Sequence, residues 1–245
     1  MPGNAGDSEN NSDLENDSAI NQRQLDWKDL LLVIAGIAII YFGVGYIFIW
    51  LGSWYTYERV LLYLNAFATQ AFFLILILII MKIRRWKWRD FGWKPVQEGY
   101  MGQVATLYIL AWIINIMYVA FIVSRGFTPP ETDAYTKLLS NNTLITLILN
   151  FILAGILAPI IEETLFRGVI FGSLQTYMGK WTAAAVSAAV FSGLHLQAYG
   201  FFPRFVLGIL LAYLYIRYKS IKPAVALHAT NNIMALLLVL FVEGI

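Results

Sequence analysis

The chain has 245 residues, of which 59% are hydrophobic and only 13% are charged. Soluble domains carry about 45–50% apolar and about 25% charged residues, so this composition excludes an ordinary soluble domain and indicates a membrane protein. The formal net charge of +2 gives no support to nucleic-acid binding. The absence of cysteine excludes disulfides, cysteine-based zinc sites and a thiol nucleophile.

Residues 1–29 differ from the rest of the chain, because they are acidic, rich in Asn and Ser, and poor in large apolar side chains. Such a segment cannot bury enough apolar surface to offset the entropy lost on ordering, so we predict a disordered tail. The tail lacks the short basic start of a secretory signal peptide. We therefore expect the first hydrophobic segment to be retained as an anchor.

Seven apolar stretches follow, and a bilayer core needs about 20 apolar residues for each helix that crosses it. We therefore predict an all-α, polytopic membrane protein with about seven transmembrane helices. The fifth stretch is short and the fourth runs into charged residues, so the predicted range is six to eight. The seven stretches are 30–51, 60–81, 101–123, 144–165, 181–196, 203–218 and 223–242.

The loops between these stretches differ in their content of Lys and Arg. With seven spans, one side of the membrane holds thirteen of the 17 basic residues and the other side holds four. Cytoplasmic loops collect basic residues, so we expect a multi-pass protein of the cell membrane with its N-terminus in the cytoplasm. The loop 82–99 interleaves aromatic and basic residues, which favours a belt at the membrane interface over RNA binding.

The fourth stretch ends in an unusual group of charges, "APIIEETLFRG" from Ala158 to Gly168. Glu163 and Arg167 are four residues apart, so they can form an ion pair along one helix face. Glu162 is turned by about 100° from Glu163, so the two carboxylates need not share a role. Pro159 lies just before them, where it can disturb the helix and free backbone groups.

The later stretches add further polar residues within apolar sequence. The fifth carries Phe191 and His195 on one face, and its small residues Ala185, Ala189 and Gly193 predict close approach by another helix. The seventh carries polar residues too, of which the first and last share a face: His228, Asn231 and Asn232.

Ionisable groups inside a membrane are costly, and they usually face a protein interior or a water-filled cavity. An ordinary ion pair near the interface and two packed histidines would also account for these residues. The presence of both histidines of the chain in apolar spans, together with a carboxylate, favours one shared site.

The set of residues supports a defined chemistry. A carboxylate and an imidazole can hold a water and take its proton. A second imidazole and a carboxamide can donate hydrogen bonds to a developing oxyanion. The sequence contains neither a G-x-S-x-G nucleophile motif nor an H-E-x-x-H zinc motif. Two histidines and one glutamate nevertheless form a known catalytic zinc set, so zinc remains an alternative.

Four motifs resemble those of the CPBP intramembrane proteases, a family that includes CAAX prenyl protease 2 and bacterial abortive-infection and bacteriocin-immunity proteins. "EETLFR" matches E-E-x-x-x-R, "FSGLH" matches F-x-x-x-H, and "HATNN" contains H-x-x-x-N. A looser motif appears as "FVLGILLA", and the four occur in the order of the family. The resemblance covers roughly residues 100–245.

The resemblance implies roles for individual residues. Glu162 would be the general base, His195 would help it to hold the water, and His228 with Asn232 would form the oxyanion hole. Glu163, Arg167 and Phe191 would support them. The resemblance is compatible with a metalloprotease, in which Glu162, His195 and His228 would bind zinc. We favour a hydrolase without a metal cofactor, because Asn232 is a poor zinc ligand and a good hydrogen-bond donor.

Together these observations predict three regions: the tail 1–29, two transmembrane helices and a basic cytoplasmic loop in 30–99, and a CPBP-like protease core in 100–245. The predicted function is hydrolysis of a peptide bond in a membrane-associated protein or peptide. The first alternative is a non-catalytic immunity or scaffold protein that keeps the fold. The second, an ion or proton transporter, is disfavoured because the sequence shows no clear internal repeat.

Overall fold

The computed structural model describes residues 27–54, 58–127 and 143–243. These residues form helices and no strand, which confirms the predicted all-α class. Most of the predicted tail lies outside the described residues. The first described helix begins at Trp27, three residues before the predicted boundary at residue 30.

The described residues contain six helical runs that are long and apolar enough to cross a membrane, which is within the predicted range. The helices and short helical turns are α2 Trp27–Gly52, α3 Glu58–Arg84, η1 Trp88–Phe91, α4 Tyr100–Ser124, α6 Leu144–Asn150, η2 Phe151–Leu157, α7 Ala158–Glu163, η3 Thr164–Phe171, α8 Gly172–Met178, α9 Lys180–Gly193, α10 Ala198–Tyr218 and α11 Lys222–Glu243.

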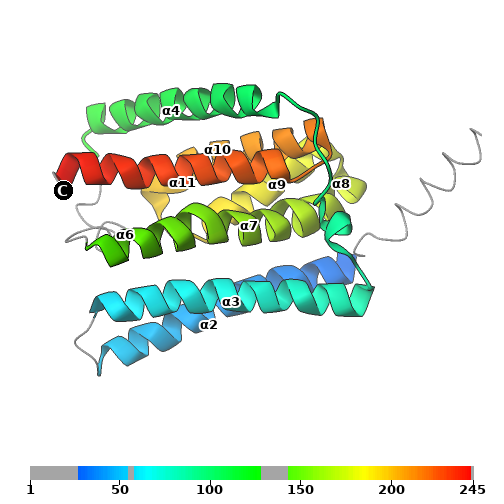
Figure 1. The fold of residues 1–245 in the computed structure, drawn as a ribbon, viewed down its shortest axis with the longest axis horizontal. Coiled ribbons are helices and arrows are strands. Elements are labelled where there is room, and N and C mark those ends of the chain that lie inside the picture. Colours follow the sequence, from blue (N-terminus) through cyan, green and yellow to red (C-terminus); the bar gives the residue numbers. More distant parts are fainter. Residues whose placement is uncertain (1–26, 55–57, 128–142, 244–245) are drawn as a thin grey trace, which may run out of the picture.

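The fifth predicted stretch forms α9, which has 14 residues. Such a helix is about 21 Å long, whereas the hydrocarbon core of a bilayer is about 30 Å thick. Figure 1 shows that α2 begins at one end of the bundle and α11 finishes at the other. The two ends of the helical region therefore lie at opposite ends of the bundle, as predicted.

The fourth predicted stretch was expected to end at residue 165, and this boundary is wrong. A continuous helical run extends from Leu144 to Met178, through α6, η2, α7, η3 and α8. All eight residues of η3 are buried, including Arg167. The run continues because Arg167 has a partner inside the protein, so the charge does not have to leave the membrane.

The predicted small-residue stripe of α9 is also placed on the wrong face. Gly193 has no side chain or backbone atom within 4 Å of the position of an added Cβ. The close approach uses the neighbouring stripe, in which Ala184 and Ala188 are completely buried. A Cβ added to Gly208 of α10 would lie 2.7 Å from the Cβ of Ala188. In an alanine-rich helix, two faces carry small residues four apart, and the sequence could not distinguish them.

The helices form a bundle around the run 144–178 (Figure 1). The pair α2 and α3 lies on one side of this run, and α4 lies beyond α11 on the other side. Buried apolar residues of α2 and α3 join those of α7, η3 and α9 in one core cluster. The short turn η1 packs on η3, where an added Cβ on Gly168 would lie 2.5 Å from the carbonyl oxygen of Phe91.

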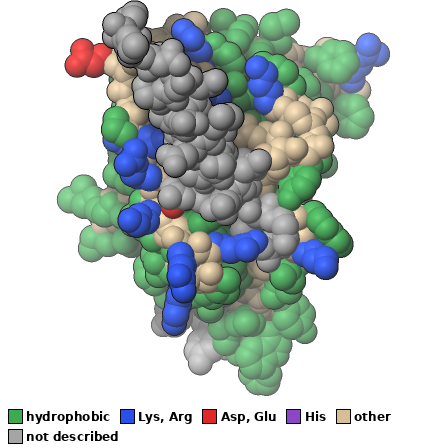
Figure 2. All heavy atoms as spheres, turned by 90° about the vertical axis from the view of Figure 1, so that its right-hand side faces the viewer, with side chains coloured by type: hydrophobic (Ala, Val, Ile, Leu, Met, Phe, Trp, Pro, Cys, Tyr) green, Lys and Arg blue, Asp and Glu red, His purple; other side chains and the backbone are tan. Residues whose placement is uncertain are grey.

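One end of the bundle carries many basic side chains. At this end α2, α4, α9 and α11 begin, and α3 and α10 finish (Figure 1). Figure 2 shows this end from outside, with Lys and Arg side chains spread over it. The distribution agrees with the bias from which the orientation was predicted, although Arg167, assigned to a loop in that prediction, lies in the interior.

Candidate active site

Two π-helical turns, η2 and η3, flank the six residues of α7 that carry both glutamates. In a π-helical turn the N–H of one residue bonds the carbonyl five residues earlier, as Ala158 does with Leu153. The next such donor, to the carbonyl of Ala154, would be residue 159, but Pro159 has no N–H. The side chain of Asn232 on α11 donates to this carbonyl instead, at 2.8 Å. The predicted effect of Pro159 on the backbone is thus confirmed, and it fixes Asn232 beside the glutamates.

Glu163 and Arg167 form a completely buried ion pair, with 2.8 Å between Arg167 Nη1 and Glu163 Oε1. This confirms the predicted pairing. Arg167 also donates from Nη2 to the carbonyl of Gly208 at 3.1 Å, and its guanidinium lies 5.0 Å from the centre of the Phe191 ring. The close approach of α10 to α9 at Gly208 therefore brings a second acceptor to the arginine.

His228 connects the two carboxylates. Its Nδ1 lies 2.9 Å from Oε1 of Glu163. The carboxylate can only accept, so Nδ1 carries the proton and donates. The other ring nitrogen, Nε2, lies 3.9 Å from Oε2 of Glu162. The bond to Glu163 therefore holds the ring so that Nε2 is directed toward Glu162.

Glu162 occupies a more open environment than its neighbour. Its side chain keeps 16% of its accessible surface, whereas that of Glu163 keeps none. Gln70 of α3 donates from Nε2 to Oε1 of Glu162 at 3.0 Å. Glu162 thus has one oxygen bound by an amide and the other facing an imidazole, which is a suitable arrangement for a group that exchanges a proton.

His195 follows the last turn of α9 and is held by Phe191. Its Nδ1 lies 2.9 Å from the carbonyl oxygen of Phe191, so Nδ1 donates and Nε2 is left as the other ring nitrogen. The Phe191 ring makes edge-to-face contacts with both imidazoles, at 5.1 Å from His195 and 5.6 Å from His228. Among the described residues, no hydrogen bond joins His195 to Glu162.

Comparisons with known proteins place these residues in a family. Residues 144–234 match the model of the family described as "Type II CAAX prenyl endopeptidase Rce1-like". This segment contains Glu162, Glu163, Arg167 and both histidines. We refer to residues 144–234, which match this model, as the Rce1-like domain. The resemblance predicted from the four motifs is therefore confirmed.

Curated relatives match over similar parts of the chain. An Escherichia coli protein named "Uncharacterized 24.3 kDa protein" is 26% identical, over 51% of this chain and 62% of its own length. The "UPF0177 protein YaiF" of Lactococcus lactis is 28% identical, over 53% and 59%. The Bacillus subtilis protein named "Putative membrane peptidase YdiL" is 31% identical, over 34% of each chain. The match thus spans less than two thirds of each of these relatives, and no solved structure gives a significant match.

Sequence reasoning did not identify every residue that contacts the site. Gln70 lies outside the Rce1-like domain, and its only signal was that it is one of two amides, with Asn65, in the apolar stretch 60–81. Trp93, after η1, donates from its indole to the hydroxyl of Thr164 at 3.1 Å, and Thr164 in turn donates to the carbonyl of Ile160. The carbonyl of Gly208 could not be predicted as a partner of Arg167, because every residue has a backbone carbonyl and the sequence does not show which one is bonded.

The zinc alternative can be tested against the positions of the predicted ligands. In the Rce1-like domain, Glu162 and His228 approach each other, and the bond of His195 Nδ1 to a backbone carbonyl leaves its Nε2 open, as in metal-binding histidines. Within the described residues, no three side chains of His, Asp or Glu lie close enough together to hold a metal ion. The arrangement therefore does not fit a three-ligand zinc site, and no chemical step is assigned to a metal below.

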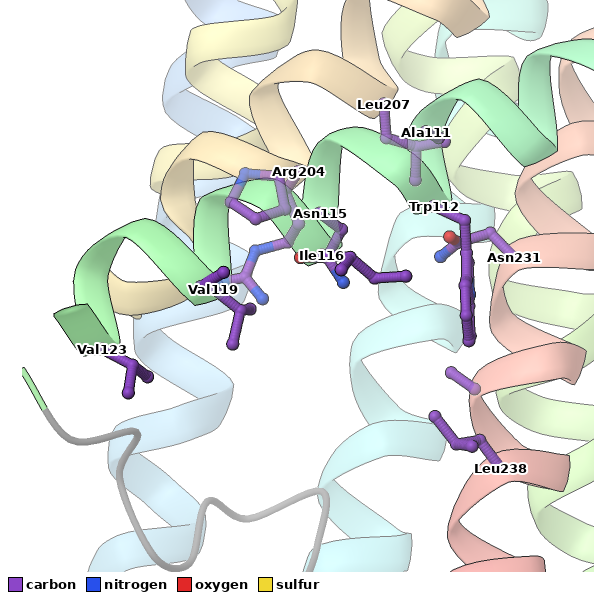
Figure 3. A pocket seen from close by; sticks show the side chains of 13 residues that line it. Ala111, Trp112, Asn115, Ile116, Val119, Val123, Arg204, Leu207, Asn231 and Leu238 are labelled. Carbon is purple, nitrogen blue, oxygen red and sulfur yellow. The ribbon is translucent and has the colours of Figure 1, made fainter.

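A cavity of about 600 Å³ lies between α4, α10 and α11. Its wall is mainly apolar, with three polar side chains, Asn115, Arg204 and Asn231, visible in Figure 3. Asn231 also donates to the side-chain oxygen of Asn232 at 3.4 Å. The cavity is thus connected to Asn232 only through Asn231, and neither the glutamates nor the histidines line it; its size is typical of ligand sites.

Proposed function

We propose that this protein is an intramembrane endopeptidase that hydrolyses a peptide bond of a membrane-associated substrate. The observation that carries the proposal is the contrast between two adjacent carboxylates. Glu163 is closed off by Arg167 and His228, whereas Glu162 is partly open and has one oxygen directed at an imidazole. A buried ion pair alone would serve packing, but a second, accessible carboxylate at the same depth suits a general base.

The proposed reaction begins with a water held by Glu162 and His195. Glu162 takes a proton from this water, and the oxygen of the water attacks the carbonyl carbon of the substrate. The C–N bond then breaks, and the proton passes from Glu162 to the departing amine. The products are an amine, which carries the first proton of the water, and a carboxylic acid, which keeps the oxygen and the second proton until it loses that proton to solvent. Each atom of the water is thus accounted for, and the reaction needs no redox partner.

The oxyanion that forms during attack requires hydrogen-bond donors. We assign this role to Nε2 of His228 and to the side-chain amide of Asn232. The separation of 3.9 Å between His228 Nε2 and Glu162 Oε2 allows both groups to contact one reacting carbonyl. In this role Nε2 carries a hydrogen besides the one that Nδ1 donates to Glu163.

The apolar cavity beside Asn231 is the proposed place for an apolar segment of the substrate. We also propose that the basic end of the bundle, seen in Figure 2, faces the cytoplasm of a cell membrane, because cytoplasmic loops collect Lys and Arg. No nucleic acid is involved in this proposal. The substrate is a membrane protein or a membrane-bound peptide.

A proteomic comparison of membranes tests the proposal. Cells would express the wild-type protein, the variant Glu162→Gln or the control Glu98→Gln, which changes an exposed glutamate before α4. We expect new peptide termini with the wild type and with Glu98→Gln, and their absence with Glu162→Gln at equal expression. Identical termini in all three samples would contradict the proposal and favour a scaffold that only retains the protease fold.

A further inference from the structure

Gln70 lies on α3, outside the Rce1-like domain, and contacts the proposed general base. Its Nε2 donates to Oε1 of Glu162 at 3.0 Å. The chemistry fixes this orientation of the carboxamide, because a rotation of 180° would set its oxygen against a carboxylate that can only accept. One oxygen of Glu162 is thus held by Gln70, and the other faces His228 at 3.9 Å.

The carboxamide oxygen of Gln70 contributes no hydrogen bond to the described fold. Oε1 is buried and has no hydrogen-bond partner among the residues that the structure describes. A buried acceptor without a partner lowers the stability of the folded state. An apolar side chain of the same length would avoid this loss. A glutamine at this position is therefore unfavourable for packing and useful for holding a carboxylate.

The attachment of α3 to the domain does not depend on Gln70. Phe73 and Ile77, on the same helix, are buried in the core cluster that also contains Ile161 and Leu165 of the central run. Such apolar burial contributes most of the free energy of helix packing. The helix pair α2 and α3 would therefore remain in place without the amide, so the role of Gln70 can be separated from the fold.

We propose that Gln70 is a positioning residue: it holds Oε1 of Glu162, so that Oε2 is directed at the reacting water and carbonyl beside His228. This inference rests on the proposed function of Glu162 as the general base. It makes the N-terminal helix pair a part of the active site, although this pair lies outside the residues that match the family.

The first test replaces Gln70 by methionine, which has a similar length and no hydrogen-bonding amide. The substrate is a synthetic peptide that spans a cleavage site identified in the membrane comparison. We expect kcat to fall about tenfold with KM unchanged, because orientation of the base matters in the transition state and not for binding. The melting temperature in detergent should equal or exceed that of the wild type, since the unpaired oxygen is removed.

The matched control is Gln175→Met, the same change at a glutamine of α8 whose amide donates to the carbonyl of Gly172 at 3.3 Å. Its kcat and KM should remain those of the wild type. A fall of kcat and melting temperature together in Gln70→Met, with the control unaffected, would overturn the positioning role and make Gln70 a structural residue.

A double-mutant cycle with Glu162→Asp gives the second test. Aspartate is one methylene shorter, so its carboxylate withdraws from Gln70 and the hydrogen bond is already lost. We therefore expect Gln70→Met to lower kcat by less than twofold in the Glu162→Asp background. The same tenfold loss in both backgrounds would show that Gln70 acts independently of Glu162, and would overturn the inference.

Failure of this inference can be distinguished from failure of the proposed function. If Glu162→Gln cleaves the peptide like the wild type, Glu162 is not the base and both proposals are overturned. If Glu162→Gln is inactive but Gln70→Met has the kcat of Gln175→Met, the protease proposal stands and the positioning role of Gln70 is overturned.

Discussion

Two neighbouring parts of the interior differ in how exposed their charged side chains are and in how many partners these side chains have. Around Arg167 the charges are sealed: Glu163 and Arg167 keep no accessible surface, and Nη1, Nη2 and the face of the guanidinium all have neighbours. Around Glu162 the structure is more open, with a partly exposed carboxylate and a single amide from α3. The difference suggests that one part fixes the geometry and the other performs chemistry.

The largest effect that this comparison predicts is on the rate of cleavage. Glu162→Gln should reduce kcat by roughly 10⁴-fold, the upper range for the loss of a general base, while the protein stays folded and inserted in the membrane. Single-turnover cleavage of the identified peptide by purified protein measures this. Loss of expression without a separable defect in catalysis would remove the distinction between the two parts.

Asn232→Ala tests whether Asn232, which lies between the open and the sealed part, donates a hydrogen bond to the oxyanion. Loss of one donor to an oxyanion costs on the order of 10²–10³ in rate, so this variant should remain a slow but measurable enzyme. Steady-state kinetics gives the value. Because Asn232 also binds the carbonyl of Ala154, a small fall in melting temperature should accompany the change. A rate equal to that of the wild type would exclude Asn232 from the oxyanion hole.

The sealed part should respond mainly in stability. Glu163→Gln and Arg167→Leu each leave a buried charge without its partner, so each should lower the free energy of unfolding by about 3–5 kcal/mol. Glu162→Gln should lower it far less, because Glu162 is partly exposed. Thermal unfolding in one detergent ranks the three variants. If Glu162→Gln is the least stable of them, the roles assigned to the two carboxylates are wrong.

Removal of metal ions should produce the smallest effect. If the mechanism has no metal, treatment with a chelator leaves cleavage almost unchanged, and elemental analysis of active protein gives far less than one metal per chain. A zinc enzyme would lose activity with its metal and recover both on addition of zinc. One firmly held zinc per chain, with activity that follows its removal and return, would make Glu162, His195 and His228 the ligands.

The sequence predicted the features that depend on local pattern. Apolar length located the membrane helices, and spacing along a helix correctly paired Glu163 with Arg167 and Phe191 with His195. Pro159 was correctly expected to free a backbone group, since a missing N–H is a property of the residue itself.

Features that depend on distant contacts were missed. The run from 144 to 178 continues because of partners on α10 and α11, and Gln70 reaches Glu162 across 92 positions of sequence. The face of α9 that packs on Gly208 could not be chosen, because Ala184 and Ala188 repeat the spacing of the predicted stripe. Periodicity identifies a face of a helix, but it does not identify the neighbour of that face.

The bond between Asn232 and the carbonyl of Ala154 has a consequence for biogenesis. The two residues are 78 positions apart, and α11 follows all the other described helices in the chain. Until α11 is inserted, the central run lacks both this donor and the imidazole that binds Glu163. The insertion of α11 thus supplies both partners at once, and the proposed catalytic group is assembled only by the last of the described helices.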